Sequence, residues 1–316
     1  MKKTYWHLPL SPLVSLGTVF GVTTLFGTDL LLTRRLGIPH GGLVIAFIFA
    51  LYGLFLAERM VNARRHATVR RIALRFFSLV FLAQLFLGLF LSSAWLFRGE
   101  PSLPHPLFIL FSPFDSTKGA HLLFLWAISL VLTGPAFCSH LCWLGTWDHF
   151  AAQKKHRATP VSFPRARLIV AALVLITGFA AIYFFPLKVT VTLGFLFVMG
   201  AVFVMMISRS RGSMVQCGLY CPLGTLTTIL SRISPFSIVK SSGKKVPPQE
   251  CPFGQFSGAQ SRGPVPEGCT LCGDCLDRGA SHDLSMKFLR FKFNAWPLFV
   301  ALVTGLHAAF FILFIP

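Results

Sequence analysis

The stretch "CSHLCWLGTW", Cys138 to Trp147, directly follows a long apolar run and places two cysteines four residues apart. The chain repeats this pattern at "CGLYCPLGTL", Cys217 to Leu226, again after an apolar run. Both segments read C-x-x-x-C-x-x-G-T. Residues at i and i+4 of a helix lie on one face, so both thiolates of a pair can reach one site. The motifs therefore predict two matched thiolate pairs, each at the end of a hydrophobic segment.

The composition around these motifs is that of a membrane protein. Of the 316 residues, 54% are hydrophobic and only 12% are charged, whereas soluble domains carry about 25% charged residues. A bilayer requires each spanning segment to satisfy its own backbone hydrogen bonds, which favours helices. We therefore expect an all-α polytopic membrane protein.

Seven runs have about the 20 mostly apolar residues that one membrane span needs. They cover roughly residues 9–33, 40–58, 72–97, 119–137, 168–187, 189–208 and 295–315. The first run follows two lysines, as a signal peptide would. It is too long for a signal peptide and no small-residue cleavage site follows it, so we expect it to remain as a span.

The basic residues predict the orientation of these spans. If the N-terminus lies inside, 23 of the 29 Lys and Arg residues fall in inner segments and five fall in outer loops. The positive-inside rule then places the N-terminus in the cytoplasm and the C-terminus in the periplasm of a bacterial inner membrane. Arg34 and Arg35 oppose this arrangement, and the first two runs could instead form a hairpin that does not fully cross.

The same orientation places all eight cysteines on the cytoplasmic side, where structural disulfides are not expected. Metal ligation or thiol redox chemistry is the expected use of these residues. The net charge of +19 suits anionic lipid at this side of the membrane, and we expect no nucleic-acid partner. We divide the chain into a two-helix segment (1–71), a four-helix core with both motifs (72–234), a cytoplasmic insert (235–294) and a last helix (295–316).

The insert carries Cys269-x-x-Cys272-x-x-Cys275 in a stretch rich in Gly, Pro and charge. Three cysteines at this spacing wrap three corners of a cubane cluster, and in bacterial ferredoxins a distant Cys-Pro supplies a further ligand. Here Cys251-Pro252 stands upstream. We predict one 4Fe–4S cluster on these four cysteines, with a structural zinc site as the alternative.

The four membrane-edge cysteines leave more alternatives open. A gapless alignment pairs Cys138 with Cys217 and Cys142 with Cys221, and a parallel two-helix repeat would bring the pairs together. They could hold a second iron–sulfur cluster. They could also form redox-active dithiols or a soft-metal site such as one for Cu(I), or act only as small buried hydrophobes.

The backbone around these centres has recurring Gly and Pro residues. Gly145 and Gly224 follow the two pairs at the same distance, where glycine lets the backbone approach a site closely. Pro222 and Pro252 each follow a cysteine directly. His140 lies between the two cysteines of the first pair and is a candidate for an unusual ligand.

These motifs resemble those of membrane ferredoxin-type proteins over about residues 70–290. That family includes the quinol-dehydrogenase membrane subunit of periplasmic nitrate reductase systems, the methylamine-utilisation ferredoxin-type protein and the C-terminal part of the nitrous-oxide-reductase regulator. The chain departs from the family pattern in two places. Trp143 stands where the family has proline, so that only Cys221-Pro222 matches fully, and the insert holds one triplet instead of two complete ferredoxin motifs.

The resemblance implies a membrane electron-transfer subunit of an oxidoreductase complex. Electrons would pass through iron–sulfur centres between the quinone pool, or a cytoplasmic donor, and a partner redox protein. We expect other subunits and an acidic ferredoxin or flavoprotein as partners, quinone as a candidate cofactor, no haem and no catalytic side chain. The alternative is an assembly protein that uses its cysteines to handle copper or to reduce a metal for another enzyme.

Overall fold

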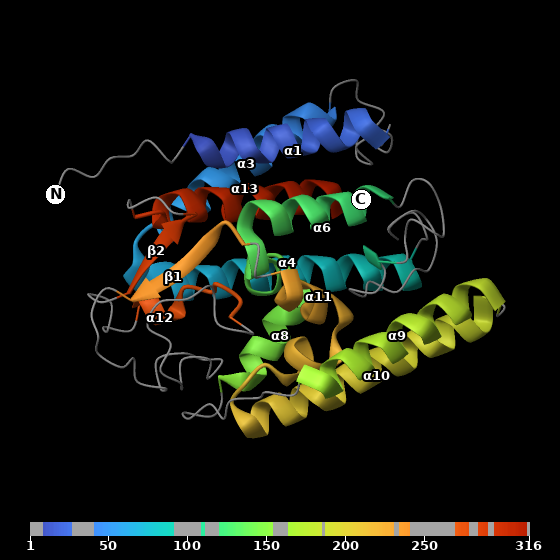
Figure 1. Cartoon of the computed structure of the whole chain (residues 1–316). Coiled ribbons are helices and arrows are strands. Elements are labelled where there is room, and N and C mark those ends of the chain that lie inside the picture. The colour runs from blue at the N-terminus through green and yellow to red at the C-terminus, as the bar shows by residue number, and fades with distance from the viewer. Residues whose placement is uncertain are drawn as a thin grey trace.

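The computed structural model describes residues 9–26, 41–91, 109–110, 120–153, 164–184, 187–230, 234–240, 269–277, 284–289 and 294–314. These residues form a helical bundle with one small sheet (Figure 1). The longer helices are α1 (Leu10–Phe26), α3 (Gly41–Met60), α4 (Ala63–Phe90), α6 (Ala120–Thr133), α8 (Trp143–Ala152), α9 (Pro164–Phe184), α10 (Leu187–Arg211), α11 (Pro222–Leu230) and α13 (Trp296–Phe314). Each of the seven predicted apolar runs overlaps one of them.

Four membrane-spanning candidates stand out among the described residues. Helices long and apolar enough to cross a bilayer cover Gly42–Met60, Arg65–Gly88, His121–His140 and Trp296–Leu313, and Leu10–Leu25 is a shorter apolar helix. The chain is therefore consistent with a membrane protein, and seven spans remain a prediction. Helix α4 begins at Ala63, before its apolar run starts at residue 72. The segment directly before that run, which we expected to be an inner loop, is therefore helical.

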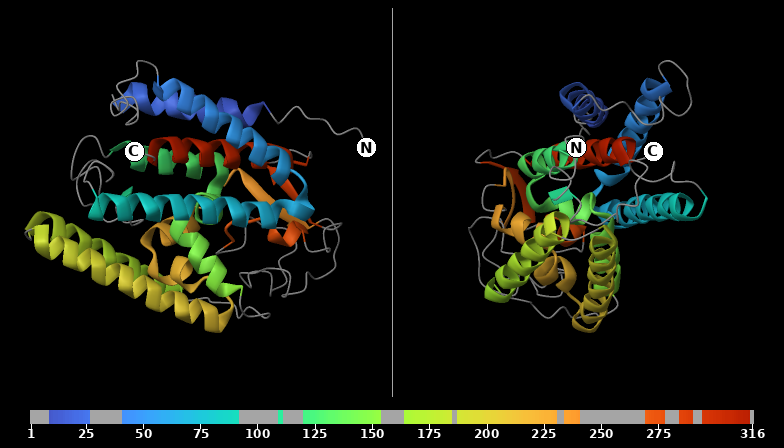
Figure 2. Two further views of the ribbon diagram at one scale, coloured as in Figure 1. Left: turned by 180° about the vertical axis from the view of Figure 1, so that it is seen from behind. Right: turned by 90° about the vertical axis from the view of Figure 1, so that its right-hand side faces the viewer.

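Helix α13 packs against both α1 and α3, which also contact each other, on one side of the bundle (Figures 1 and 2). Small residues allow this close packing, as is common between membrane helices. A Cβ atom at Gly305 would lie 2.6 Å from the carbonyl oxygen of Ser11, and the hydroxyl oxygens of Ser11 and Thr304 are 2.9 Å apart. Helix α13 is thus packed closely against α1 and hydrogen-bonded to it.

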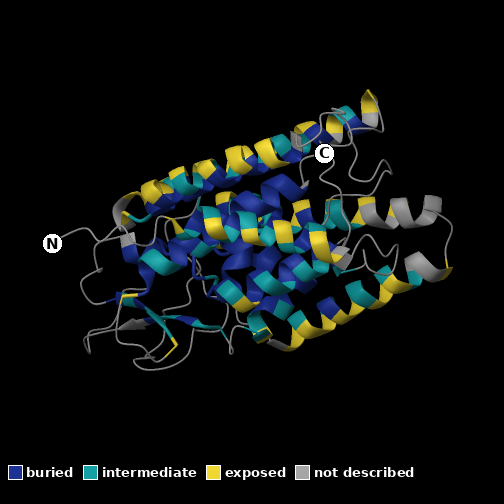
Figure 3. Ribbon diagram, turned by 90° about the horizontal axis from the view of Figure 1, so that it is seen from above, coloured by how far each residue is buried: buried dark blue, intermediate teal, exposed yellow. Residues whose placement is uncertain are grey.

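Helices α9 and α10 lie side by side on the opposite side of the bundle, away from α1 and α3 (Figures 1 and 2). Their outer surfaces are apolar and exposed: Phe184 is 82% exposed and Met206 is 67% exposed. By contrast α13 is buried along nearly its whole length (Figure 3). Exposed apolar helices around a buried central helix are what a lipid environment would accommodate.

Two strands that the sequence analysis did not predict join the ends of the insert. Strand β1 (Phe236–Lys240) pairs antiparallel with β2 (Leu284–Phe288), in a register that places Phe236 opposite Phe288. Phe236 is fully buried and its ring centroid lies 5.3 Å from that of Phe299 on α13. The sheet therefore fixes both ends of the insert against the bundle.

Short irregular helices carry the chain from the apolar helices into the cysteine motifs. After α6, Gly134 adopts φ 64° and begins a 3-10 turn, η4 (Gly134–Ala136), which leads into α7 (Phe137–His140). A Cβ atom at Gly134 would collide with the side chain of Ser234, so the turn requires glycine. In the second half a π-helix, η5 (Gln216–Tyr220), stands at the matching place before α11.

Candidate metal centre

The two C-x-x-x-C motifs share one backbone structure. Cys142 directly precedes α8 with φ −81° and ψ 118°, and Cys221 directly precedes α11 with φ −82° and ψ 120°. Each of these cysteines donates its N–H to the carbonyl five residues earlier, at 2.9 Å in both motifs. The hydroxyls of Thr146 and Thr225 donate back to the cysteine carbonyls, at 3.3 Å in both. Similar residues at matched positions therefore form the same local structure twice.

The glycines of the motifs are required by close backbone packing. A Cβ atom at Gly145 would collide with the carbonyl oxygen of Cys138, and one at Gly224 would collide with the carbonyl oxygen of Cys217. Each glycine thus lets the start of its helix fold back over the first cysteine of its own motif. The expected approach of this backbone to a bound centre stays a prediction.

The two motifs also contact each other reciprocally. The thiol of Cys138 lies 3.6 Å from the hydroxyl of Thr227, and the backbone N–H of Cys217 donates to the Asp148 carboxylate at 2.9 Å. Asp148 and Thr227 stand ten residues after the first cysteine of their own motifs. Each half therefore contacts the first cysteine of the other half from the same position, which is the contact pattern of a two-fold axis.

The four membrane-edge thiols lie close enough to influence one another. Burial raises the pKa of Cys221, and the charges of Cys142 and Cys138 raise it further. Burial also raises the pKa of Cys217 well above its usual value. The charge of Asp148 raises it further, and the charges of the three other thiols add to this effect. Four ionised thiols in one buried place would repel each other strongly. A cationic metal centre would remove that cost, so the donor set fits an iron–sulfur cluster.

Backbone N–H groups are directed at the second cysteine of each motif. Burial raises the pKa of Cys142 and of Cys221, whereas the N–H groups two and three residues later in each case lower it. The N-terminus of a helix stabilises a thiolate in this way. N–H groups directed at ligating sulfurs also influence the reduction potential of a cluster. The starts of α8 and α11 are therefore suited to thiolate ligands.

The cysteine triplet of the insert is buried, with exposed fractions of 7%, 5% and 4%. Cys269 and Cys275 pack with residues of β1, β2 and α13, and Cys272 packs beside Cys217. Leu271 and Gly273 adopt φ values of 49° and 78°, so the chain turns sharply between cysteines. A Cβ atom at Gly273 would lie 2.7 Å from the ring of Trp296. This tight loop fits the wrapping that a cubane cluster requires.

Two predicted residues, Cys251 and Pro252, lie outside the described residues, so the structure places three of the four ligands predicted for this cluster. Pro222 is the first residue of α11, where its fixed φ suits a helix start. Among the described residues, no three His, Cys, Asp or Glu side chains form a site for a single metal ion. A cubane separates its ligating sulfurs more widely than one ion does.

The two groups of cysteines are neighbours. Cys217 of the second motif and Cys272 of the triplet belong to one small buried group, together with Ala152 and Met214. These four residues come from three separate parts of the sequence, which the fold brings together. The membrane-edge centre and the insert are thus adjacent, a relation that the sequence alone did not show.

Sequence reasoning missed the charged residue that joins both cysteine regions. Arg70 on α4 is 2% exposed and donates to the Asp274 carboxylate at 2.7 Å and to the Ser139 carbonyl at 2.8 Å. Burial alone would raise the pKa of Asp274, but the Arg70 guanidinium outweighs it and holds that pKa well below its usual range. A carboxylate between two cysteines that were predicted to be buried ligands was a signal that a cation must lie nearby.

Histidines fill the space between the two regions and form hydrogen bonds to backbone and side-chain groups there. His140 contacts the Ser139 hydroxyl at 2.9 Å through Nδ1 and the Nε2 atom of His66 at 3.3 Å through Nε2. His66 also contacts the Cys272 carbonyl at 3.1 Å, and His307 contacts the His140 carbonyl at 3.2 Å. Both ring nitrogens of His140 are therefore used in these contacts, and the structure does not support it as a ligand.

Comparison with known families agrees with this site. Residues 120–160 and 191–241 match the family model of a 4Fe-4S binding domain. These two stretches contain all four membrane-edge cysteines, and the triplet lies outside them. Searches of the curated proteins and of the solved structures give no match. The match supports a ferredoxin-type iron–sulfur protein with a 4Fe–4S cluster as its cofactor.

Proposed function

We propose that the chain is a membrane electron-transfer subunit with two adjacent iron–sulfur centres. The membrane-edge centre would be held by Cys138, Cys142, Cys217 and Cys221, and the insert centre by Cys251, Cys269, Cys272 and Cys275. The observation that carries the proposal is the reciprocal contact between two buried motifs. Both motifs lie within stretches that match a 4Fe-4S binding domain.

A bound cluster supplies reversible one-electron chemistry. The chain's own residues supply the environment. They bury the thiols, direct N–H groups of α8 and α11 at Cys142 and Cys221, and hold Cys217 next to Cys272. Arg70 supplies one buried positive charge between the two regions. This arrangement favours transfer between two centres inside one chain, so no substrate chemistry beyond electron transfer is required.

We propose seven spans with the cysteine motifs facing the cytoplasm and the C-terminus facing the periplasm. Helices α4 and α6 would form one half of a parallel repeat, and α9 and α10 the other. The matched motif geometry supports the repeat. In Figure 1, the elements β1, β2, α12 (Asp274–Asp277) and the start of α4 lie at the left end of the bundle, whereas α13 ends at the right. This separation agrees with an insert and a C-terminus on opposite sides of the membrane.

The electron donor would be the quinone pool or a cytoplasmic donor, and the acceptor a partner protein in a larger complex. The charge of +19 favours an acidic partner such as a ferredoxin or a flavoprotein, because opposite charges steer association. These roles follow from the family resemblance and from charge.

Metal and sulfide analysis of anaerobically purified full-length protein tests the proposal. Two clusters predict about eight iron atoms and about eight acid-labile sulfides per chain, with electron paramagnetic resonance signals from two interacting centres on reduction. About four iron atoms together with copper would support the assembly role instead. Zinc without iron would contradict electron transfer altogether.

A further inference from the structure

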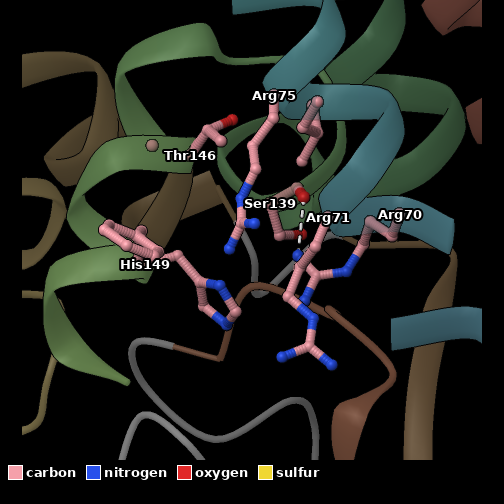
Figure 4. A pocket seen from close by; sticks show the side chains of 9 residues that line it. Arg70, Arg71, Arg75, Ser139, Thr146 and His149 are labelled. Carbon is pink, nitrogen blue, oxygen red and sulfur yellow. Dashed lines mark hydrogen bonds between the residues drawn. The ribbon is translucent and has the colours of Figure 1, made fainter. Parts of the chain in front are cut away.

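A basic pocket lies beside the first cysteine motif, between α4 and α8 (Figure 4). Three arginines of α4 line it, and α7 and α8 contribute side chains with hydrogen-bonding capacity. The charged and polar residues that line the pocket are Arg70, Arg71, Arg75, Ser139, Thr146 and His149. Figure 4 shows the guanidinium groups of Arg71 and Arg75 and the ring of His149 turned into the same space from two facing helices.

The positive charge of this pocket exceeds its negative charge. Within the part of the chain that the structure describes, Asp274 forms an ion pair with Arg70 at 2.7 Å, and its other carboxylate oxygen lies 3.4 Å from the Nε2 atom of His149. One buried carboxylate thus offsets Arg70, and the charges of Arg71 and Arg75 have no described carboxylate partner.

The two remaining arginines are held in place by contacts that leave their terminal nitrogens available. The Nε atom of Arg71 donates to the Ala67 carbonyl at 2.7 Å. The guanidinium of Arg75 lies over the Phe150 ring, 4.9 Å from its centroid. Neither contact uses the outer fork of a guanidinium, which is the part that binds two oxygens of a phosphate or carboxylate.

The first cysteine motif forms part of the wall of this pocket. Gly145 and Thr146 line the pocket, and the Thr146 hydroxyl is bonded to the Cys142 carbonyl at 3.3 Å. An occupant would therefore lie directly against the backbone of the first cysteine motif. Arg70 is buried and suited to offset the charge of the cysteine centres, whereas Arg71 is half-buried and Arg75 is exposed. The outer pair therefore suits an anion that enters from outside.

We propose that this pocket binds a phosphate-type oxyanion between Arg71 and Arg75. The anion comes either from the headgroup of an anionic phospholipid or from free phosphate. Basic pockets between membrane helices at the cytoplasmic surface bind lipid headgroups by the same chemistry. Binding does not depend on the proposed electron-transfer role, because the arginines and the pocket are present whether or not electrons pass.

The test uses full-length protein with its iron, reconstituted in nanodiscs of phosphatidylcholine alone or with phosphatidylglycerol. Inorganic phosphate is titrated into the first preparation by calorimetry, and lipid retained by the second is counted by native mass spectrometry. The test variant is R71Q/R75Q. The matched control is R59Q/R65Q, which removes the same charge nearby and also removes an arginine–aromatic contact, that of Arg59 over Phe55 at 5.1 Å.

If free phosphate is the source, we expect one phosphate to bind in phosphatidylcholine discs. Its affinity should fall about tenfold or more in R71Q/R75Q and stay unchanged in R59Q/R65Q. If lipid is the source, we expect the wild type and R59Q/R65Q to retain one phosphatidylglycerol molecule and R71Q/R75Q to lose it. Wild-type protein that binds neither anion would overturn the proposal without reference to any variant. Equal weakening in both variants would also overturn it, because net charge alone would then explain binding.

Discussion

The Nη2 atom of Arg70 lies 2.7 Å from the Oδ1 atom of Asp274, and both side chains are almost fully buried. The pair connects α4 to the loop between Cys272 and Cys275. Because the same guanidinium donates to the Ser139 carbonyl, one side chain fixes the first cysteine motif and the insert loop relative to each other. This buried ion pair therefore helps to set the relative position of the two cysteine regions.

Removal of either partner of this pair should destabilise the protein strongly. Arg70→Gln or Asp274→Asn leaves one buried charge without its partner, which costs about 3–5 kcal/mol. We expect a lower thermal midpoint and loss of iron from the insert centre first. Arg65→Gln, an exposed position on the same helix, is the control. A midpoint for Asp274→Asn equal to that of the control would show that the pair does not hold the loop.

The motif glycines give a sharp test of the membrane-edge centre. In Gly145→Ala and Gly224→Ala the new methyl group collides with the carbonyl oxygen of the first cysteine, so we expect loss of that centre. Gly218→Ala is the control, because it lies inside the second motif and a Cβ there meets nothing within 4 Å. The measurement is iron content and the spectrum of the reduced protein. Full retention of iron in both test variants would contradict the close packing described here.

The tryptophan that replaces the family's proline should be dispensable for metal binding. Trp143 occupies the first position of α8 as Pro222 does in α11, and its ring packs on Phe81 with centroids 5.4 Å apart. Trp143→Pro keeps the helix start but loses this contact. We expect full iron content with stability reduced by about 1–3 kcal/mol. A loss of iron in Trp143→Pro would show that the tryptophan serves the centre directly.

Acidification should destabilise the protein partly through His149. Burial lowers the pKa of His149 below its usual value of 6.5, and the contact with Asp274 offsets only part of this shift. As the pH falls below about 6.5, the unfolded chain binds a proton that the folded chain resists, so folding stability is lost. His149→Gln should therefore show a smaller drop in thermal midpoint between about pH 7.5 and pH 5.5 than the wild type. An equal drop in both proteins would exclude this residue as a source of acid sensitivity.

The sequence predicted the parts of this structure that local patterns determine. Apolar runs of sufficient length predicted the helices, and the repeated C-x-x-x-C-x-x-G-T predicted two matched segments at the ends of apolar helices. These features depend on neighbours in the sequence and on the requirement that backbone groups in lipid be satisfied locally. The match of both motifs to a 4Fe-4S binding domain agrees with the cluster chemistry predicted from the cysteines.

Other features depend on contacts between distant segments, so no local pattern indicated them. Arg70 counted only as one more basic residue of an inner loop, until α4 was found to begin at Ala63 and carry it into the core. The five-residue strands that begin at Phe236 and Leu284 pair across the insert, and they pack with two of the three buried cysteines of the triplet. Cys251 lies outside the described residues and stays a prediction.

The most direct test of the central claim is the iron content of Cys142→Ser and Cys221→Ser, measured separately and together in anaerobically purified protein. If the two motifs share one cluster, each single variant and the double variant should lose the same amount, about four iron atoms per chain. The spectrum that remains should be that of the insert centre in all three. Additive losses, with each single variant removing half of what the double variant removes, would contradict a shared centre.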